Sequence, residues 1–151
     1  MIRITKQTDY GIVLLTHLAG QPERLFNAPD LATETHLPLP MVSKILKLLA
    51  REGLLTSHRG VKGGYTLARL PEEISMADVI RILEGPIAIT ECVDDSGDCA
   101  HQPICPVRGH WQKINEAVRG ALDGLSLAEM APGPKLVTLG RGAFAGQLRQ
   151  A

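Results

Sequence analysis

The chain has 151 residues, 16 basic against 16 acidic, and only two Phe, two Tyr and one Trp. This length allows one domain with a sizeable core or a small domain with an appendage, and the core must consist of Leu, Ile, Val and Ala. No apolar run approaches the roughly 20 residues that span a bilayer, and the N-terminus lacks a secretory pattern. We therefore expect a cytoplasmic protein with no membrane partner, whose thiols stay reduced.

The charge is unevenly distributed. Residues 1–70 carry nine Lys and Arg against five Asp and Glu, residues 71–105 carry one against eight, and residues 106–151 carry six against three. This asymmetry suggests one surface for a polyanion and another with a different role. The alternative is an ordinary solvated surface.

Three helices are predicted in the basic part. Apolar periodicity predicts a helix over residues 5–20. Asn27 is a suitable N-cap for a short second helix that runs to about residue 32, and residues 35–40 form a turn. A third helix is predicted over about 40–52, because apolar residues recur there every three or four positions: Val42, Ile45, Leu46 and Leu49.

A basic hairpin follows the third helix. Residues 54–57 and 65–67 resemble short strands, and a glycine-rich tip joins them. Three helices and a basic hairpin in this order are the parts of a winged helix-turn-helix, whose third helix enters the major groove. The predicted DNA-binding residues lie on that helix and at the hairpin tip: Ser43, Lys44, Lys47, Arg51, Arg59 and Lys62. Alternatively, the basic residues form the solvated side of an amphipathic helix.

The cysteines, Cys92, Cys99 and Cys105, lie within fourteen residues. They occupy an acidic loop, residues 86–106, after a fourth helix that we expect from Ser75 to about residue 85. Thiols this close on irregular backbone can converge on one centre. An odd count disfavours a disulfide framework, and the paired knuckles of structural zinc are missing. We rank iron–sulfur ligation first, zinc second, and a catalytic thiol or unrelated buried thiols well behind.

Three cysteines leave one ligand position open. His101 and His110 are nearby in sequence, whereas Asp9 could reach the site through folding or from a partner subunit. As alternatives, Asp9 is a helix-start residue favoured by the dipole, and His110 is an ordinary surface histidine.

A longer helix is predicted from Val107 to about Leu122, and we expect the tail, residues 132–151, to be mostly disordered. Its apolar residues form one stripe that would suit contact with another helix: Val107, Trp111, Ile114 and Val118.

Over about residues 1–131 the chain resembles the IscR/NsrR family of iron–sulfur winged-helix transcription regulators. Four features carry the resemblance: the three cysteines, the opening Ile4-Thr5-Lys6-Gln7-Thr8-Asp9-Tyr10, the hairpin Arg59-Gly60-Val61-Lys62-Gly63-Gly64-Tyr65-Thr66-Leu67, and His110-Trp111. It implies a mainly α fold with a small β-hairpin wing, a homodimer paired through the long helix, and double-stranded operator DNA as partner. It implies a regulator and no enzyme.

We accordingly divide the chain into a winged helix-turn-helix DNA-binding domain (1–85), a cluster-binding loop (86–106) and a dimerisation helix with a short C-terminal helix (107–131). The tail (132–151) lies beyond the resemblance.

The resemblance also implies a ligand set. Cys92, Cys99 and Cys105 would hold a 2Fe-2S or 4Fe-4S cluster. Members with a histidine ligand place it three residues after the last cysteine, where this chain has Arg108. Members that use an aspartate from the opposite subunit's first helix place it at Asp9. We therefore prefer Asp9 as the fourth ligand, with His110 second.

The six-residue first cysteine gap and the opening of the chain look most like the subgroup that regulates the SUF iron–sulfur assembly operon. We expect a repressor and redox sensor that responds to cluster supply or oxidative stress. The nearest alternative is a nitric-oxide-sensing repressor of the same family. Alternatives of another class are a thiol oxidoreductase and a zinc-stabilised interaction module.

Overall fold

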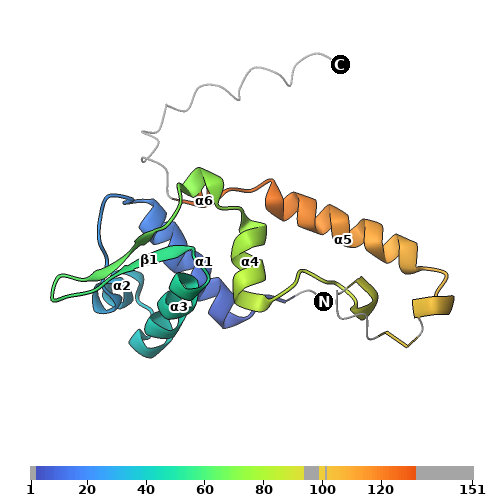
Figure 1. Ribbon diagram of the computed structural model, residues 1–151, viewed down its shortest axis with the longest axis horizontal. Helices are drawn as coiled ribbons and strands as arrows, with labels where there is room; N and C mark the ends of the chain where they lie inside the picture. Colours follow the sequence, from blue (N-terminus) through green and yellow to red (C-terminus); the bar gives the residue numbers. More distant parts are fainter. Residues whose placement is uncertain (1–2, 94–98, 101, 132–151) are drawn as a thin grey trace, which may run out of the picture.

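The computed structural model describes residues 3–93, 99–100 and 102–131. Six helices and one two-stranded antiparallel hairpin form this part of the chain (Figure 1). They are α1 (Lys6–Ala19), α2 (Ala28–Thr35), α3 (Leu39–Arg51), β1 (Leu55–His58), β2 (Gly64–Leu67), α4 (Met76–Glu84), α5 (Arg108–Asp123) and α6 (Leu127–Met130), with short 3-10 turns η1 (Pro71–Glu73), η2 (Glu91–Val93) and η3 (Gln102–Ile104). The predicted mainly α fold with a hairpin wing is confirmed. The tail that we expect to be disordered lies outside the described residues.

Short polar side chains cap the N-terminal ends of three helices. Thr5 caps α1 and Ser75 caps α4, each by accepting a backbone N–H three residues later. Asn27 caps α2 in the same way, with its Oδ1 accepting from the Asp30 N–H at 2.8 Å, as predicted. α3 begins at Leu39, one residue before the predicted start, without a side-chain cap.

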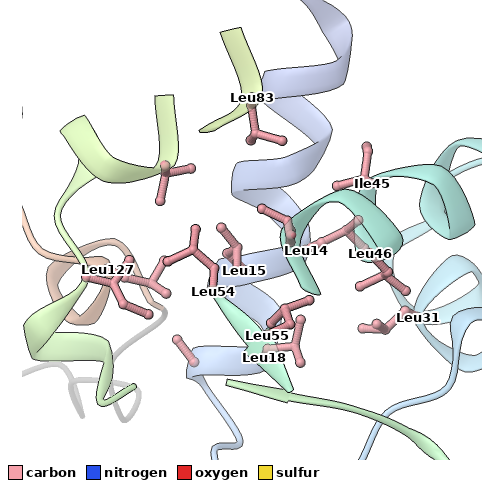
Figure 2. Close-up of a cluster of buried hydrophobic side chains, with 14 of the residues drawn as sticks. Leu14, Leu15, Leu18, Leu31, Ile45, Leu46, Leu54, Leu55, Leu83 and Leu127 are labelled. Carbon is pink, nitrogen blue, oxygen red and sulfur yellow. The ribbon is translucent and has the colours of Figure 1, made fainter. Parts of the chain in front are cut away.

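The core is almost entirely aliphatic and surrounds α1. Figure 2 shows Leu31, Ile45 and Leu46 on one side of this helix and Leu127 on the other. All of these side chains are fully buried. Each contributes roughly 1.5–3 kcal/mol relative to exposure, so this core fixes α3 firmly against α1.

α6 returns to this core after the long helix. It packs against α1 and η1. Two backbone hydrogen bonds join the entrance of α6 to the entrance of α4, from Met76 N to Leu125 O and from Leu127 N to Ile74 O, both at 2.8 Å. The chain therefore leaves the helical unit through the cysteine region and α5, and re-enters it at α6.

α5 lies largely outside the core. It contacts α4 and η2, projects away from the helix bundle in Figure 1, and Asn115 is its only fully buried residue. In the described part of the chain, none of the helices has the length and apolar character needed to cross a membrane.

Candidate nucleic-acid interface and cysteine segment

α3 separates apolar and polar side chains cleanly. Val42, Ile45, Leu46 and Leu49 are buried, whereas Lys44, Lys47 and Arg51 are exposed and Ser43 is half-buried. The predicted polar face therefore exists and points away from the core. Arg51 forms an ion pair with Glu52 at 3.0 Å. Lys44 and Lys47 form no ion pair with an acidic side chain in the part of the chain that the structure describes.

The wing, residues 55–67, presents two cations on a narrow backbone. Arg59 and Lys62 are exposed at its tip. Gly63 N–H donates to Gly60 O at 3.0 Å, which closes a tight turn. A Cβ at Gly63 would collide with the backbone oxygen of His58, so glycine is required there. The tip is thus slim enough to approach a groove of DNA.

The base of the wing is attached to the segment before α2. Phe26 and Tyr65 exchange two backbone hydrogen bonds, at 3.1 and 2.7 Å. The Cβ of a larger residue at position 64 would meet the Phe26 carbonyl. These contacts orient the wing relative to α2 and α3, and sequence patterns gave no sign of them.

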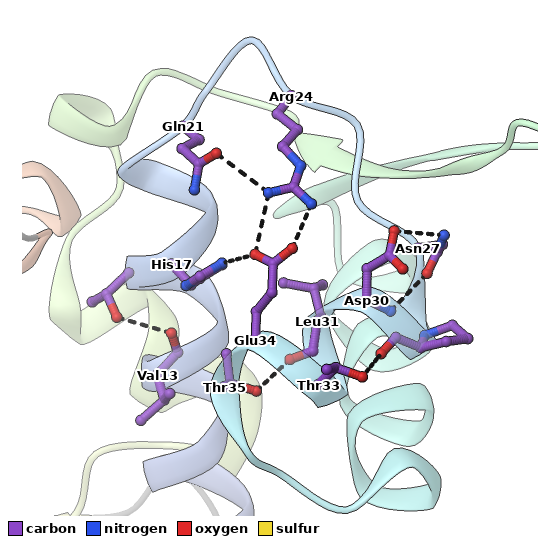
Figure 3. A network of polar contacts seen from close by, with 12 residues as sticks. Val13, His17, Gln21, Arg24, Asn27, Asp30, Leu31, Thr33, Glu34 and Thr35 are labelled. Carbon is purple, nitrogen blue, oxygen red and sulfur yellow. Dashed lines mark hydrogen bonds and ion pairs between the residues drawn. The ribbon is translucent and has the colours of Figure 1, made fainter.

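A charged network joins α1, α2 and the loop between them (Figure 3). His17 Nε2 donates to Glu34 at 2.7 Å, and Arg24 donates to the same carboxylate while its guanidinium lies 4.3 Å from the centre of the Phe26 ring. The Arg24 hydrogen bond first, and the His17 hydrogen bond second, hold the pKa of Glu34 below its ordinary value of 4.5. The network spans residues far apart in sequence, so no local pattern predicts it.

The three thiols differ in exposure. Cys92, in η2, is buried, and its Sγ lies 3.2 Å from Thr90 Oγ1. Cys99 and Cys105 are half-buried, and all three are free. Within residues 3–93, 99–100 and 102–131, no group of three His, Cys, Asp or Glu side chains is gathered as a metal site. Three thiols on irregular backbone are nevertheless a donor set that suits iron–sulfur or zinc ligation.

The candidate fourth ligands lie on helix starts. Asp9 and His110 are both exposed, in the first turns of α1 and α5; His101 lies outside the described residues. The start of α1 is tied to the end of α4 because Glu84 Oε1 accepts the Thr5 N–H at 2.7 Å. Hydrogen bonds from Thr8 and then Thr5 lower the pKa of Glu84.

An unpredicted residue, Asn115, holds the beginning of the cysteine region. Its Nδ2 donates to Ile87 O at 3.0 Å, and its Oδ1 accepts from Ile89 N–H at 3.1 Å. The remaining face of α5 is apolar but open: Val107 and Ile114 are exposed, and Trp111 and Val118 are half-buried. Such a face is typical of a helix that pairs with another chain.

Comparison with known proteins places these features in context. The family model Rrf2, described as an iron-dependent transcriptional regulator, matches residues 4–133. The HTH-type transcriptional regulator NsrR of Halalkalibacterium halodurans is 28% identical over 85% of this chain and 90% of its own length.

Two solved structures share the fold. The global cysteine regulator CymR of B. subtilis superposes with a TM-score of 0.69 at 31% identity, covering 87% of this chain and 97% of its own. IscR of T. potens superposes with a TM-score of 0.66 at 27% identity, covering 85% of each chain.

Proposed function

Because this chain belongs to the Rrf2 family of helix-turn-helix transcriptional regulators, we propose that it represses iron–sulfur assembly (SUF) genes under the control of an iron–sulfur cluster. It is a regulator and not an enzyme. The cofactor does not follow from the family alone, since one similar structure is described as a global cysteine regulator. The observation that carries the proposal is the placement of three free thiols within fourteen residues, between the winged helix and α5.

DNA binding in this proposal follows from the two basic surfaces. Ser43 and Lys44 near the start of α3 reach base edges in the major groove, while Lys47 and Arg51 contact phosphates. The wing places Arg59 and Lys62 in the adjacent minor groove. Pairing of two chains through α5 would present two α3 helices to half-sites about 34 Å apart.

The ligands in this proposal are Cys92, Cys99 and Cys105, with Asp9 of the partner subunit as the fourth and His110 as the second choice. When bound, the cluster supplies a centre that oxidants or nitric oxide can alter. Asp9 lies on the exposed side of α1, whose opposite side is buried against α3. Ligation by Asp9 would therefore favour one position of α1 and α3. The free energy of operator binding would then differ between cluster-containing and cluster-free protein by the coupling free energy.

Replacement of Asp9 tests this coupling. We expect Asp9→Ala to shorten the lifetime of the cluster and to reduce the difference in operator affinity between cluster-containing and cluster-free protein. His110→Ala is the matching variant at the second candidate for the fourth ligand. Unchanged absorption and an unchanged affinity difference in Asp9→Ala would remove Asp9 from the ligand set.

The proposed function is tested by fluorescence anisotropy with a labelled SUF promoter fragment. The expected result is tight, salt-dependent binding whose affinity differs by about tenfold or more between the two forms of the protein. Equal affinities would contradict control by a cluster. Release of DNA by nitric oxide, without a response to cluster loss, would favour the nitric-oxide-sensing alternative.

A further inference from the structure

We propose that Asn115 is a positioning residue that fixes the cysteine segment, residues 86–93, on α5 and so connects the dimerisation helix to the first thiol. The inference rests on the proposed function, since the position of Cys92 matters for regulation only if its sulfur is a ligand.

Both polar atoms of the Asn115 side chain make hydrogen bonds to the segment. The residue is 5% exposed, its Nδ2 donates to Ile87 O at 3.0 Å, and its Oδ1 accepts from Ile89 N–H at 3.1 Å. One side chain therefore satisfies the carbonyl and the amide on one edge of the segment, as a neighbouring β-strand would. A buried amide without these partners would be costly, so α5 and the segment fit together in a single register.

The segment is only partly covered by packing. A pocket of about 300 Å³ borders it, lined by Ile87 and Val93 together with Arg119 of α5. A second pocket, of about 580 Å³, also borders it and is lined by Ile87, Ala88 and Ile89 together with Val118. With this open space beside the segment, the two Asn115 hydrogen bonds are directional contacts that help to determine where it lies.

The same residue lies between two functional elements. Asn115 is one helical turn from Trp111 and from Val118, which belong to the apolar stripe of α5. On the segment side, Ile89 is followed by Thr90, whose hydroxyl lies 3.2 Å from Cys92 Sγ. A shift of α5 on pairing with a second chain would therefore move Asn115. Through its hydrogen bond to Ile89, it would also move the backbone of residues 89–92 and the Cys92 sulfur.

The test compares Asn115→Leu with Gln112→Leu in the full-length protein. Gln112 is exposed on the same helix, so the control also replaces a side-chain amide by leucine but at a position away from the Asn115 hydrogen bonds. In cluster-free protein we expect amide exchange of residues 87–93 to be about tenfold faster in Asn115→Leu only. In reconstituted protein we expect faster cluster loss in air, with dimerisation by sedimentation unchanged.

A second variant separates the two hydrogen bonds. Asn115→Asp keeps an acceptor for Ile89 N–H but loses the donor to Ile87 O, so we expect exchange between that of the wild type and that of Asn115→Leu.

Two results would overturn the proposal, and a third would overturn the function on which it rests. Unchanged exchange in Asn115→Leu would show that this residue is not the anchor. Faster exchange with unchanged cluster lifetime would show a local structural contact that does not position a ligand. Failure of the wild type to assemble a cluster would overturn the proposed function, whereas the exchange experiment would still decide whether Asn115 anchors the segment.

Discussion

Cys92 is the one buried thiol, and its contact with Thr90 gives it a distinct chemistry. A thiolate that ligates metal has no proton, so at 3.2 Å the Thr90 hydroxyl must donate to Cys92 Sγ. Hydrogen bonds to the sulfurs of an iron–sulfur cluster favour the reduced, more negative form and raise the reduction potential. If Cys92 ligates the proposed cluster, the Thr90 hydroxyl would tune the reduction potential of the centre without being a ligand.

We expect Thr90→Val to lower the reduction potential of the cluster by tens of millivolts, because about 60 mV corresponds to 1.4 kcal/mol for one electron. Thr90→Ser keeps the hydroxyl and is the control. A redox titration followed by absorption measures both. Equal potentials in Thr90→Val and the wild type would show that the hydroxyl does not donate to a ligating sulfur.

Single residues were predictable where they carry charge or a thiol in a local pattern. Lys44 and Lys47 follow from the helical period, and structure confirms that they are exposed. Asn115 could not be found in this way, because its partners Ile87 and Ile89 are distant in sequence. One signal was present: Asn115 lies on the same helical face as Trp111 and Val118, where an apolar residue is expected.

At the scale of elements, the junction of α1 and α2 depends on one carboxylate. Glu34 accepts hydrogen bonds from Arg24 and His17, which lower its pKa in the folded protein. A lowered folded pKa stabilises the fold above the ordinary value of 4.5, and this contribution is lost as the pH falls through the folded value. The network also holds α2, the helix that precedes the proposed DNA-recognition helix α3.

We expect Glu34→Gln to lower the melting temperature by a few degrees at neutral pH. The difference from the wild type should shrink below the ordinary pKa of Glu34, because protonation then removes the same charge from the wild type. Thermal melts from about pH 3 to 7 measure this difference. A difference that stays constant over this range would contradict a role for the ionised carboxylate.

The wing provides a second prediction at this scale. We expect Gly63→Ala to weaken DNA binding by about tenfold or more, because the new Cβ would collide with the His58 backbone oxygen and displace the exposed tip and its cations. Gly120→Ala is the control, since no atom lies near the added Cβ there. Anisotropy and thermal melts provide the two measurements. Unchanged affinity in Gly63→Ala would show that the tip does not contact DNA.

The helix boundaries show what sequence can predict at this scale. α1 agrees with its predicted range to one residue at each end, because Thr5 and Gly20 mark its caps. The fourth helix starts at Ser75, as predicted, and the Ser75 hydroxyl accepts the Asp78 N–H. The Asp78 carboxylate does not complete a capping box, because it is shorter than the usual Glu and pairs with Arg81 at 3.0 Å. The complete box, between Ser126 and Glu129, was not predicted.

For the whole molecule, the arrangement of α5 implies a second chain. Its apolar stripe is exposed or half-buried, and its one buried side chain is the polar Asn115. We expect Ile114→Glu to give a monomer by sedimentation and to weaken operator binding by about tenfold or more, because two half-sites are no longer held by linked helices. Lys113→Glu, an exposed charge change beside it, should leave the dimer intact. A dimeric Ile114→Glu protein would contradict pairing through this stripe.

The global path of the chain was only partly predictable. Local periodicity yields the helices and the wing, but the return of α6 to the core depends on backbone pairing between Ser75 and Ser126. Leu127 is fully buried among residues of distant segments. Such contacts have no local signature, and neither does the relative position of the three thiols.

The central claim, that the thiols hold an iron–sulfur cluster, is tested most directly by anaerobic absorption with iron and sulfide analysis of freshly purified protein. The account predicts charge-transfer bands between about 320 and 420 nm with matching iron and acid-labile sulfide. A colourless protein that contains zinc, or one that remains metal-free after reconstitution, would contradict it.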